Sequence, residues 1–267
     1  MTEILFPVAL VAGIGLVLGL GLAIASKIMA VPVDEKAEAI TEALPGANCG
    51  ACGYSGCSGY AAALSSGKET ATNLCAPGGS DAAKKVAEIM GTSPAFVIPT
   101  AAVVLCNGNT VNAQDKMVYE GVKSCRMASQ LFGGAKECTY GCLGLGDCVE
   151  ACEYDAIRIC DGVARISPIA CHSCKACVKT CPKGLIHMLP LGVPKASVLC
   201  NNHEKGAIAR KHCKAACIGC MKCVKVCESQ AVTVENNVAS VDVSKCTNCG
   251  KCVEACPTKA IKTIIIE

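Results

Sequence analysis

The chain has 267 residues, of which 25 are cysteine, five tyrosine, three phenylalanine and none tryptophan. This composition excludes a globular core built on aromatic side chains, so another device must organise most of the chain. The net charge of +3 indicates neither nucleic acid nor a membrane surface as a partner. An odd number of cysteines cannot all pair in disulfides within one chain, and metal binding is the better interpretation.

The first predicted element is an apolar helix near the N-terminus. Residues 4–26 carry no charge and as a helix would extend about 34 Å, enough to cross a hydrocarbon layer of about 30 Å. We expect a transmembrane anchor over residues 1–30 and a single-pass protein of the cell membrane. Lys27 and Lys36 follow the span and Glu3 precedes it, which favours the cytoplasmic side for the bulk of the chain.

Small residues repeat at every fourth position of this helix, at Gly15, Gly19 and Ala23. Because small residues let two helices approach closely, the spacing predicts contact with helices of partner subunits. The alternative is a plain glycine-rich anchor.

A charged stretch over residues 31–44 suits an exposed juxtamembrane helix or tether. A Cys- and Gly-rich module is expected over residues 45–95, with an amphipathic helix near residues 81–90. Its cysteines follow the spacing C-x2-C-x4-C-x17-C, and nearby glycines let the backbone fold tightly around sulfur. We interpret the group as ligands of a [4Fe–4S] cluster, with structural zinc as the alternative: Cys49, Cys52, Cys57 and Cys75.

The rest of the chain is an internal repeat, with copies over residues 100–192 and 193–267. Both copies begin with the sequence Val-Leu-Cys-Asn, at Val104 and at Val198. Between the two cysteine groups of the second copy, apolar residues alternate around Asn236-Asn237, which predicts a hairpin. Two similar small α+β modules in tandem are expected.

The spacing C-x2-C-x2-C-x3-C-P, typical of bacterial ferredoxins, occurs once in each copy, beginning at Cys171 and at Cys246. In two-cluster ferredoxins the fourth cysteine binds the other cluster. The second copy then has one cluster on Cys217, Cys220, Cys223 and Cys256, and another on Cys227, Cys246, Cys249 and Cys252. Paired zinc knuckles would not produce these triplets with a fourth cysteine and a proline.

In the first copy, one cluster falls on Cys152, Cys171, Cys174 and Cys177. The other has Cys142, Cys148 and Cys181 and needs a substitute ligand, for which Cys138 is nearest in the sequence. Cys160 is interpreted as a small buried thiol in a strand turn. Four thiols at equivalent places in the two copies indicate a candidate sixth cluster between the modules: Cys106, Cys125, Cys200 and Cys213. The alternatives are that some of these are unligated core thiols, or that Cys125 and Cys138 exchange roles.

The basic residues concentrate around the predicted clusters. Residues 168–227 hold ten Lys and Arg and one acid, whereas residues 34–88 hold seven acids and four bases. A basic face suits docking of an acidic electron carrier, or it neutralises the anionic clusters; both interpretations stand. Aromatic residues do not interleave with the lysines, so nucleic acid is not an expected partner.

With its glycine-rich helix, the sequence ANCGACGYSGC and the sequence CTYGCLGLGDCVEAC before a ferredoxin run, the chain resembles RnfB. This is the polyferredoxin subunit family of the Rnf ion-translocating ferredoxin oxidoreductase complexes, and the resemblance covers essentially the whole chain. It implies electron entry from reduced ferredoxin and exit to membrane and peripheral partner subunits, coupled to Na⁺ or H⁺ transport.

We therefore expect an α+β chain with a single N-terminal transmembrane helix, a small Fe–S module and two tandem ferredoxin-like modules. It would be the electron-relay subunit of a translocase, with at least five [4Fe–4S] clusters and no catalytic side chain. Ferredoxin would dock at the Lys-rich modules, and the N-terminal module would contact partner subunits. The alternative is a tethered stand-alone polyferredoxin that carries or stores electrons.

Overall fold

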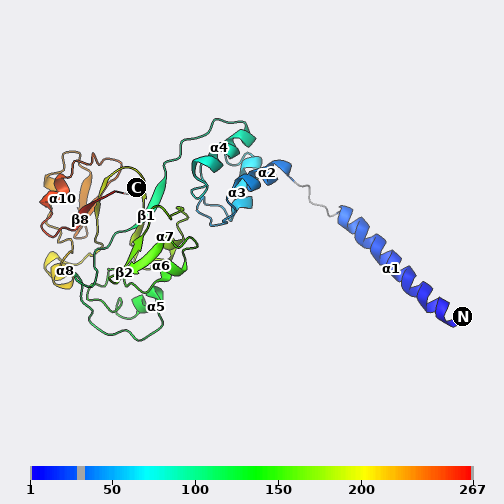
Figure 1. Ribbon diagram of the computed structural model, residues 1–267, viewed down its shortest axis with the longest axis horizontal. Helices are drawn as coiled ribbons and strands as arrows, with labels where there is room; N and C mark the ends of the chain where they lie inside the picture. Colours follow the sequence, from blue (N-terminus) through cyan, green and yellow to red (C-terminus); the bar gives the residue numbers. More distant parts are fainter. Residues whose placement is uncertain (1, 29–33, 266–267) are drawn as a thin grey trace.

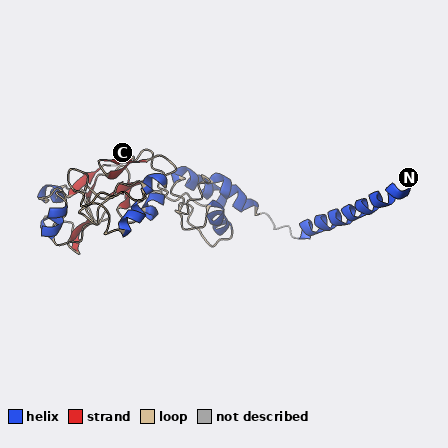
Figure 2. Cartoon of the chain, turned by 90° about the horizontal axis from the view of Figure 1, so that it is seen from below, coloured by secondary structure: helices blue, strands red, loops and turns tan. Residues whose placement is uncertain are grey.

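The computed structural model describes residues 2–28 and 34–265 of the chain. A helix, α1 (Thr2–Ile28), lies apart from a cysteine-rich body in both views (Figures 1 and 2). The described apolar side chains of α1 are exposed, with Leu16, Val17 and Leu22 at 68–72%. They have no core of their own to pack against.

The expected transmembrane helix is corrected by the structure. Crossing a hydrocarbon layer takes about 20 consecutive apolar residues in one helix. Within the described residues no helix combines the length and the apolarity that a membrane crossing requires. The anchor, and the single-pass topology that depended on it, are therefore wrong for the described chain.

Three helices form the N-terminal module: α2 (Glu35–Ala43), α3 (Cys57–Ser65) and α4 (Gly79–Met90). The Asp34 side chain caps α2 by accepting hydrogen bonds from the backbone N–H groups of Lys36 and Ala37. The fully buried side chains of Ile40 and Tyr60 help to form the core. The charged stretch is therefore not a simple tether, because α2 packs into this module.

The predicted amphipathic helix near residues 81–90 is confirmed as α4, which begins two residues earlier, ends at Met90 and is capped by Gly91 in the left-handed region. Its buried face consists mainly of alanines and Val86. Small side chains let α4 lie close to α2, with which it shares the core.

The body contains two copies of one topology. The first copy consists of β1 (Thr100–Val104), α5 (Cys125–Gln130), α6 (Asp147–Glu150), β2 (Ile157–Cys160), β3 (Val163–Ile166), α7 (Ala176–Thr180) and β4 (Ile186–Pro190). The second consists of β5 (Lys195–Val198), α8 (Gly206–His212), α9 (Lys222–Lys225), β6 (Val232–Glu235), β7 (Val238–Val241), α10 (Lys251–Ala255) and β8 (Ile261–Ile264). In each copy the first and last strands pair antiparallel and the middle two form a hairpin.

The predicted hairpin at Asn236-Asn237 is confirmed. Val232 of β6 pairs with Val241 of β7, and both turn residues have positive φ, 48° and 65°. Asn tolerates the left-handed region that a tight two-residue turn requires. Asp161 and Gly162 make the matching turn between β2 and β3.

The two copies are joined through backbone contacts. The N–H of Asn107 donates to the carbonyl of Leu199 at 3.1 Å, and the N–H of Lys214 donates to that of Asn112 at 2.8 Å. Ala113 and Cys213 also form an isolated antiparallel bridge. The segments that follow β1 and β5 are thereby held together at the junction.

Candidate iron–sulfur sites

The cysteines gather in groups at the ends of the short helices. Cys148 and Cys152 lie on and just after α6, and Cys177 and Cys181 lie on and just after α7. With this spacing, one short helix can present thiols to two different groups.

The N-terminal module holds one group, which we call site N: Cys49, Cys52, Cys57 and Cys75. Burial, followed by the neighbouring thiolates of the other three, raises the pKa of Cys75. The backbone N–H of Cys57 donates to the Asn48 side chain at 2.9 Å, which closes the loop around the group. A Cβ at Gly78 would lie 3.1 Å from the Cys75 sulfur, so the backbone approaches that sulfur closely.

The first repeat holds a second group, site 1a: Cys152, Cys171, Cys174 and Cys177. Burial and then the thiolates of the other three raise the pKa of Cys177 to about 11. The N–H of Ala102 on β1 donates to the Cys171 sulfur at 3.4 Å. The grouping is the one predicted from the spacing, and its ligand role stays a prediction.

The other group of the first repeat differs from the expected one. We call it site 1b, and it consists of Cys125, Cys142, Cys148 and Cys181, which line one small cavity. Burial and then the thiolates of Cys142, Cys125 and Cys181 raise the pKa of Cys148 to about 12. Cys138, the substitute suggested by sequence proximity, lies elsewhere.

Cys125 reaches site 1b because of a contact between two helices. The Asp147 carboxylate, in the first turn of α6, accepts hydrogen bonds from the N–H of Cys125 at 2.6 Å and the N–H of Arg126 at 3.0 Å. It also accepts from the Ser124 hydroxyl at 3.0 Å. Burial raises the pKa of Asp147, but these hydrogen bonds together outweigh that effect and lower it. The spacing of the cysteines gave no signal for this contact.

The second repeat holds two groups. In site 2a, with the expected ligands Cys217, Cys220, Cys223 and Cys256, burial and then the thiolates of Cys217 and Cys220 raise the pKa of Cys223 to about 11. Cys256 packs in the same core as Cys217 and Cys223. In site 2b, with Cys227, Cys246, Cys249 and Cys252, burial and then the thiolates of the other three raise the pKa of Cys252.

Four thiols form a further group at the junction of the two repeats, the junction group: Cys106, Cys138, Cys200 and Cys213. Cys138 thus lies with the thiols predicted for a sixth cluster, and Cys125 does not. Cys160 is exposed at the end of β2, so its interpretation as a buried thiol is wrong. The turn places its side chain on the outer surface of the hairpin.

These groups fit iron–sulfur clusters by their chemistry. Each offers cysteine sulfur, the usual ligand of such clusters, and backbone N–H groups donate to several sulfurs. In the described part of the chain, no three Cys, His, Asp or Glu side chains come together around one ion. A [4Fe–4S] cluster has one thiolate on each iron, so it does not require such a group.

Comparison with known proteins gives the family. Residues 44–77, which contain site N, match the family described as "Putative Fe-S cluster", and residues 216–260 match the "4Fe-4S dicluster domain". The B subunit of the Na(+)-translocating ferredoxin:NAD(+) oxidoreductase complex of Acetobacterium woodii is 43% identical over 92% of this chain and 73% of its own length. The chain belongs to the B-subunit family of the Rnf complexes.

Two further relatives agree. The B subunit of the ion-translocating oxidoreductase complex of Methanosarcina acetivorans is 37% identical over 89% of this chain and 90% of its own. The B subunit of the proton-translocating ferredoxin:NAD(+) oxidoreductase complex of Clostridium ljungdahlii is 38% identical over 91% of this chain and 86% of its own length. As an Rnf B subunit, the chain is an iron–sulfur subunit of an ion-translocating oxidoreductase, and the other subunits of the complex are its partners.

Proposed function

We propose that this Rnf B subunit accepts electrons from reduced ferredoxin at its second repeat and relays them to partner subunits beyond site N. Bound [4Fe–4S] clusters would supply one-electron transfer, and the protein would set their spacing and potential. Coupling to ion transport is proposed from the relatives, whose names give Na⁺ in one case and protons in another.

The observation that carries the proposal is the succession of thiol groups. Cys49 of site N lies near Cys174 of site 1a: after burial, the Cys49 thiolate is the neighbouring charge that most raises the pKa of Cys174. Tyr154 packs at the same place, stacked on His172 with ring centroids 4.1 Å apart. In the first repeat, α6 and α7 each present thiols to both site 1a and site 1b.

The second repeat has the features of an entry point. Cys220 and Cys249 are exposed, so sites 2a and 2b come close to the surface. Lys222 and Lys225 are exposed on α9 beside Cys220. Ammonium groups around an exposed cluster would attract an acidic carrier and align it for transfer.

Charge reversal tests the entry point. Lys222→Glu with Lys225→Glu should slow oxidation of reduced ferredoxin by roughly tenfold or more at low ionic strength. The difference should shrink in high salt, because exposed charges are then screened. Stopped-flow mixing of reduced ferredoxin with the isolated subunit measures the rate.

The matched control is Lys84→Glu with Lys85→Glu, which changes the charge equally on an exposed face of α4 in the N-terminal module. It should leave the rate near that of the wild type. Equal rates for the α9 variant and the wild type at low salt would exclude docking at this face.

A further inference from the structure

The junction group lies where the two repeats meet. Cys106 follows β1 and Cys200 follows β5, at equivalent positions of the two copies. The hydrogen bond between Asn107 and Leu199 holds these two segments together. The bridge between Ala113 and Cys213 brings the end of α8 to the same place.

One small cavity is lined by all four thiols of the junction group: Cys106, Cys138, Cys200 and Cys213. Its volume of about 20 Å³ equals that of the cavity lined by the four thiols of site 1b. Cys106, Cys138 and Cys213 are only 5–7% exposed. The group is thus more deeply buried than a surface zinc knuckle or a pair of redox thiols would require.

The sulfurs in this cavity accept hydrogen bonds. The N–H groups of Gly108 and Cys142 each donate to the Cys106 sulfur at 3.4 Å. The fully buried amide of Asn202 donates to the Cys138 sulfur at 3.5 Å. Donors directed at sulfur are the typical surroundings of ligated thiolates, because they stabilise the negative charge that ligation leaves there.

A buried cation lies against the same cavity. Lys136 is 5% exposed and lines the cavity, and its ammonium donates to the carbonyls of Gly108 at 2.8 Å and Gly162 at 2.7 Å. No ion pair found among residues 34–265 includes it. Because burying a cation without a counter-charge is costly, its position indicates an anionic group beside it.

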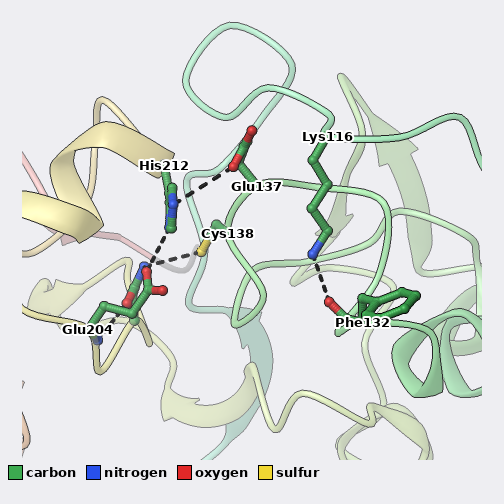
Figure 3. Close-up of polar contacts among 7 residues, drawn as sticks. Lys116, Phe132, Glu137, Cys138, Glu204 and His212 are labelled. Atoms are coloured by element: carbon green, nitrogen blue, oxygen red, sulfur yellow. Dashed lines mark hydrogen bonds and ion pairs between the residues drawn. The ribbon is translucent and has the colours of Figure 1, made fainter.

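A histidine of the second repeat contacts a carboxylate of the first, next to Cys138. Figure 3 shows His212 of α8 between Glu204 and Glu137, next to Cys138. The His212 Nδ1 lies 2.8 Å from the Glu204 carboxylate, and its Nε2 lies 3.7 Å from that of Glu137. The lining itself comes from both repeats, so the cavity exists only where the two repeats are docked.

We infer that the junction group is a ligand site for a sixth [4Fe–4S] cluster, held by two cysteines from each repeat: Cys106, Cys138, Cys200 and Cys213. This ligand set differs from the one expected from the sequence in having Cys138 in place of Cys125. The ammonium group of Lys136 supplies the counter-charge for the cluster. A single zinc ion is disfavoured as the occupant, because no three ligand side chains come together around one ion in the described part of the chain.

The site would connect the two repeats. On one side, the N–H of Cys142, a member of site 1b, donates to the Cys106 sulfur. On the other side, Cys200 lies near Cys217, a member of site 2a, whose thiolate adds to burial in raising the pKa of Cys200 to about 12. One electron at a time would pass between these neighbours; this role rests on the proposed function, whereas the ligand site does not.

Iron counting in the anaerobically purified full chain tests the site. Six clusters require about 24 irons and 24 acid-labile sulfides per chain, and Cys138→Ala or Cys213→Ala should each lower both to about 20. Cys160→Ala, at an exposed and unassigned thiol, should leave them unchanged. Retention of the other 20 irons would establish that a variant has folded.

Double variants distinguish the two ligand assignments. If Cys138 and Cys213 share one cluster, their double variant should lose about four irons, whereas Cys125→Ala with Cys213→Ala should lose about eight. The reverse pattern would return Cys125 to the sixth cluster. The sixth cluster would be excluded by two results together. The wild type would hold about 20 irons, with or without one zinc, and Cys138→Ala and Cys213→Ala would lose no iron. No ferredoxin is present in these assays, so failure of ferredoxin docking would not affect them.

A charge variant provides a second readout. Lys136→Met should lower the reduction potential of one cluster without changing the iron count, since a nearby positive charge favours the reduced form. Lys116→Met is the control, because Lys116 also donates to a backbone carbonyl, that of Phe132 at 2.7 Å (Figure 3), and Lys116 does not line the cavity. A redox titration followed by electron paramagnetic resonance compares them, and unchanged potentials in Lys136→Met would count against the counter-charge.

Discussion

At the scale of single residues, the cysteine sites depend on close approaches of the backbone. Gly144 lies between Cys142 and Cys148 of site 1b and has φ +70°. A Cβ there would lie 2.6 Å from the carbonyl oxygen of Gly162, in the turn between β2 and β3. A Cβ is fixed by the backbone and the carbonyl oxygen is itself a backbone atom, so no change of rotamer can relieve this contact.

Gly144→Ala should therefore destabilise the first repeat by about 3 kcal/mol or more, through left-handed strain and the clash together. Gly184→Ala is the control, because its φ of +60° carries the strain but a Cβ there would meet nothing within 4 Å. It should cost about 1 kcal/mol. Bleaching of the iron–sulfur absorption in increasing denaturant compares the stabilities of the two variants. Equal midpoints for Gly144→Ala and Gly184→Ala would contradict the steric account.

At the scale of elements, the short helices could be anticipated only in part. The Asn236-Asn237 hairpin follows from local turn chemistry, and β6 and β7 form where alternation places them. The position of α5 against α6 does not follow from local chemistry. It depends on the Asp147 carboxylate, which satisfies N–H groups at the start of a helix 22 residues earlier in the chain.

Removing that carboxylate should loosen Cys125. Asp147→Ala leaves the N–H groups of Cys125 and Arg126 without their acceptor, at a cost of about 1 kcal/mol typical of a lost helix cap. We expect partial or complete loss of the site 1b cluster, up to about four irons per chain, with Asp147→Asn intermediate. Asp81→Ala, in the first turn of α4, is the control and should keep the full count. An unchanged iron count in Asp147→Ala would show that Cys125 does not depend on this contact.

At the scale of the whole molecule, the thiol groups follow one another from the N-terminal module to the second repeat. Site N meets site 1a near Cys49 and Cys174, and the junction group lies between sites 1b and 2a. Helix α1 takes no part in this succession, and its described apolar side chains stay exposed. Exposed apolar surface of this extent favours a partner.

Contact of α1 with a partner subunit, along Gly15, Gly19 and Ala23, can be tested by co-purification. Gly19→Leu should reduce recovery of the other subunits at least several-fold, because a large side chain separates closely packed helices. It cannot act within the chain, since a Cβ at Gly19 would meet nothing within 4 Å. Gly21→Leu, equally unobstructed and on the opposite side of the helix, is the control. Full recovery with Gly19→Leu would favour a stand-alone polyferredoxin over a subunit packed through this face.

The sequence alone determined what is local, namely the ferredoxin runs, the repeat and the hairpin turn, and the ligand sets of sites N, 1a, 2a and 2b stay predictions from it. The runs and the turn depend on the spacing of residues a few positions apart, which the geometry of a loop or helix translates directly into position. The tertiary structure decided which distant thiol joins which group. Cys125 and Cys138 are 13 residues apart, and only the Asp147 contact and the docking of the two repeats send one to site 1b and the other to the junction. Because these contacts join elements that are distant in the sequence, the spacing of the cysteines could not predict which group Cys125 and Cys138 join.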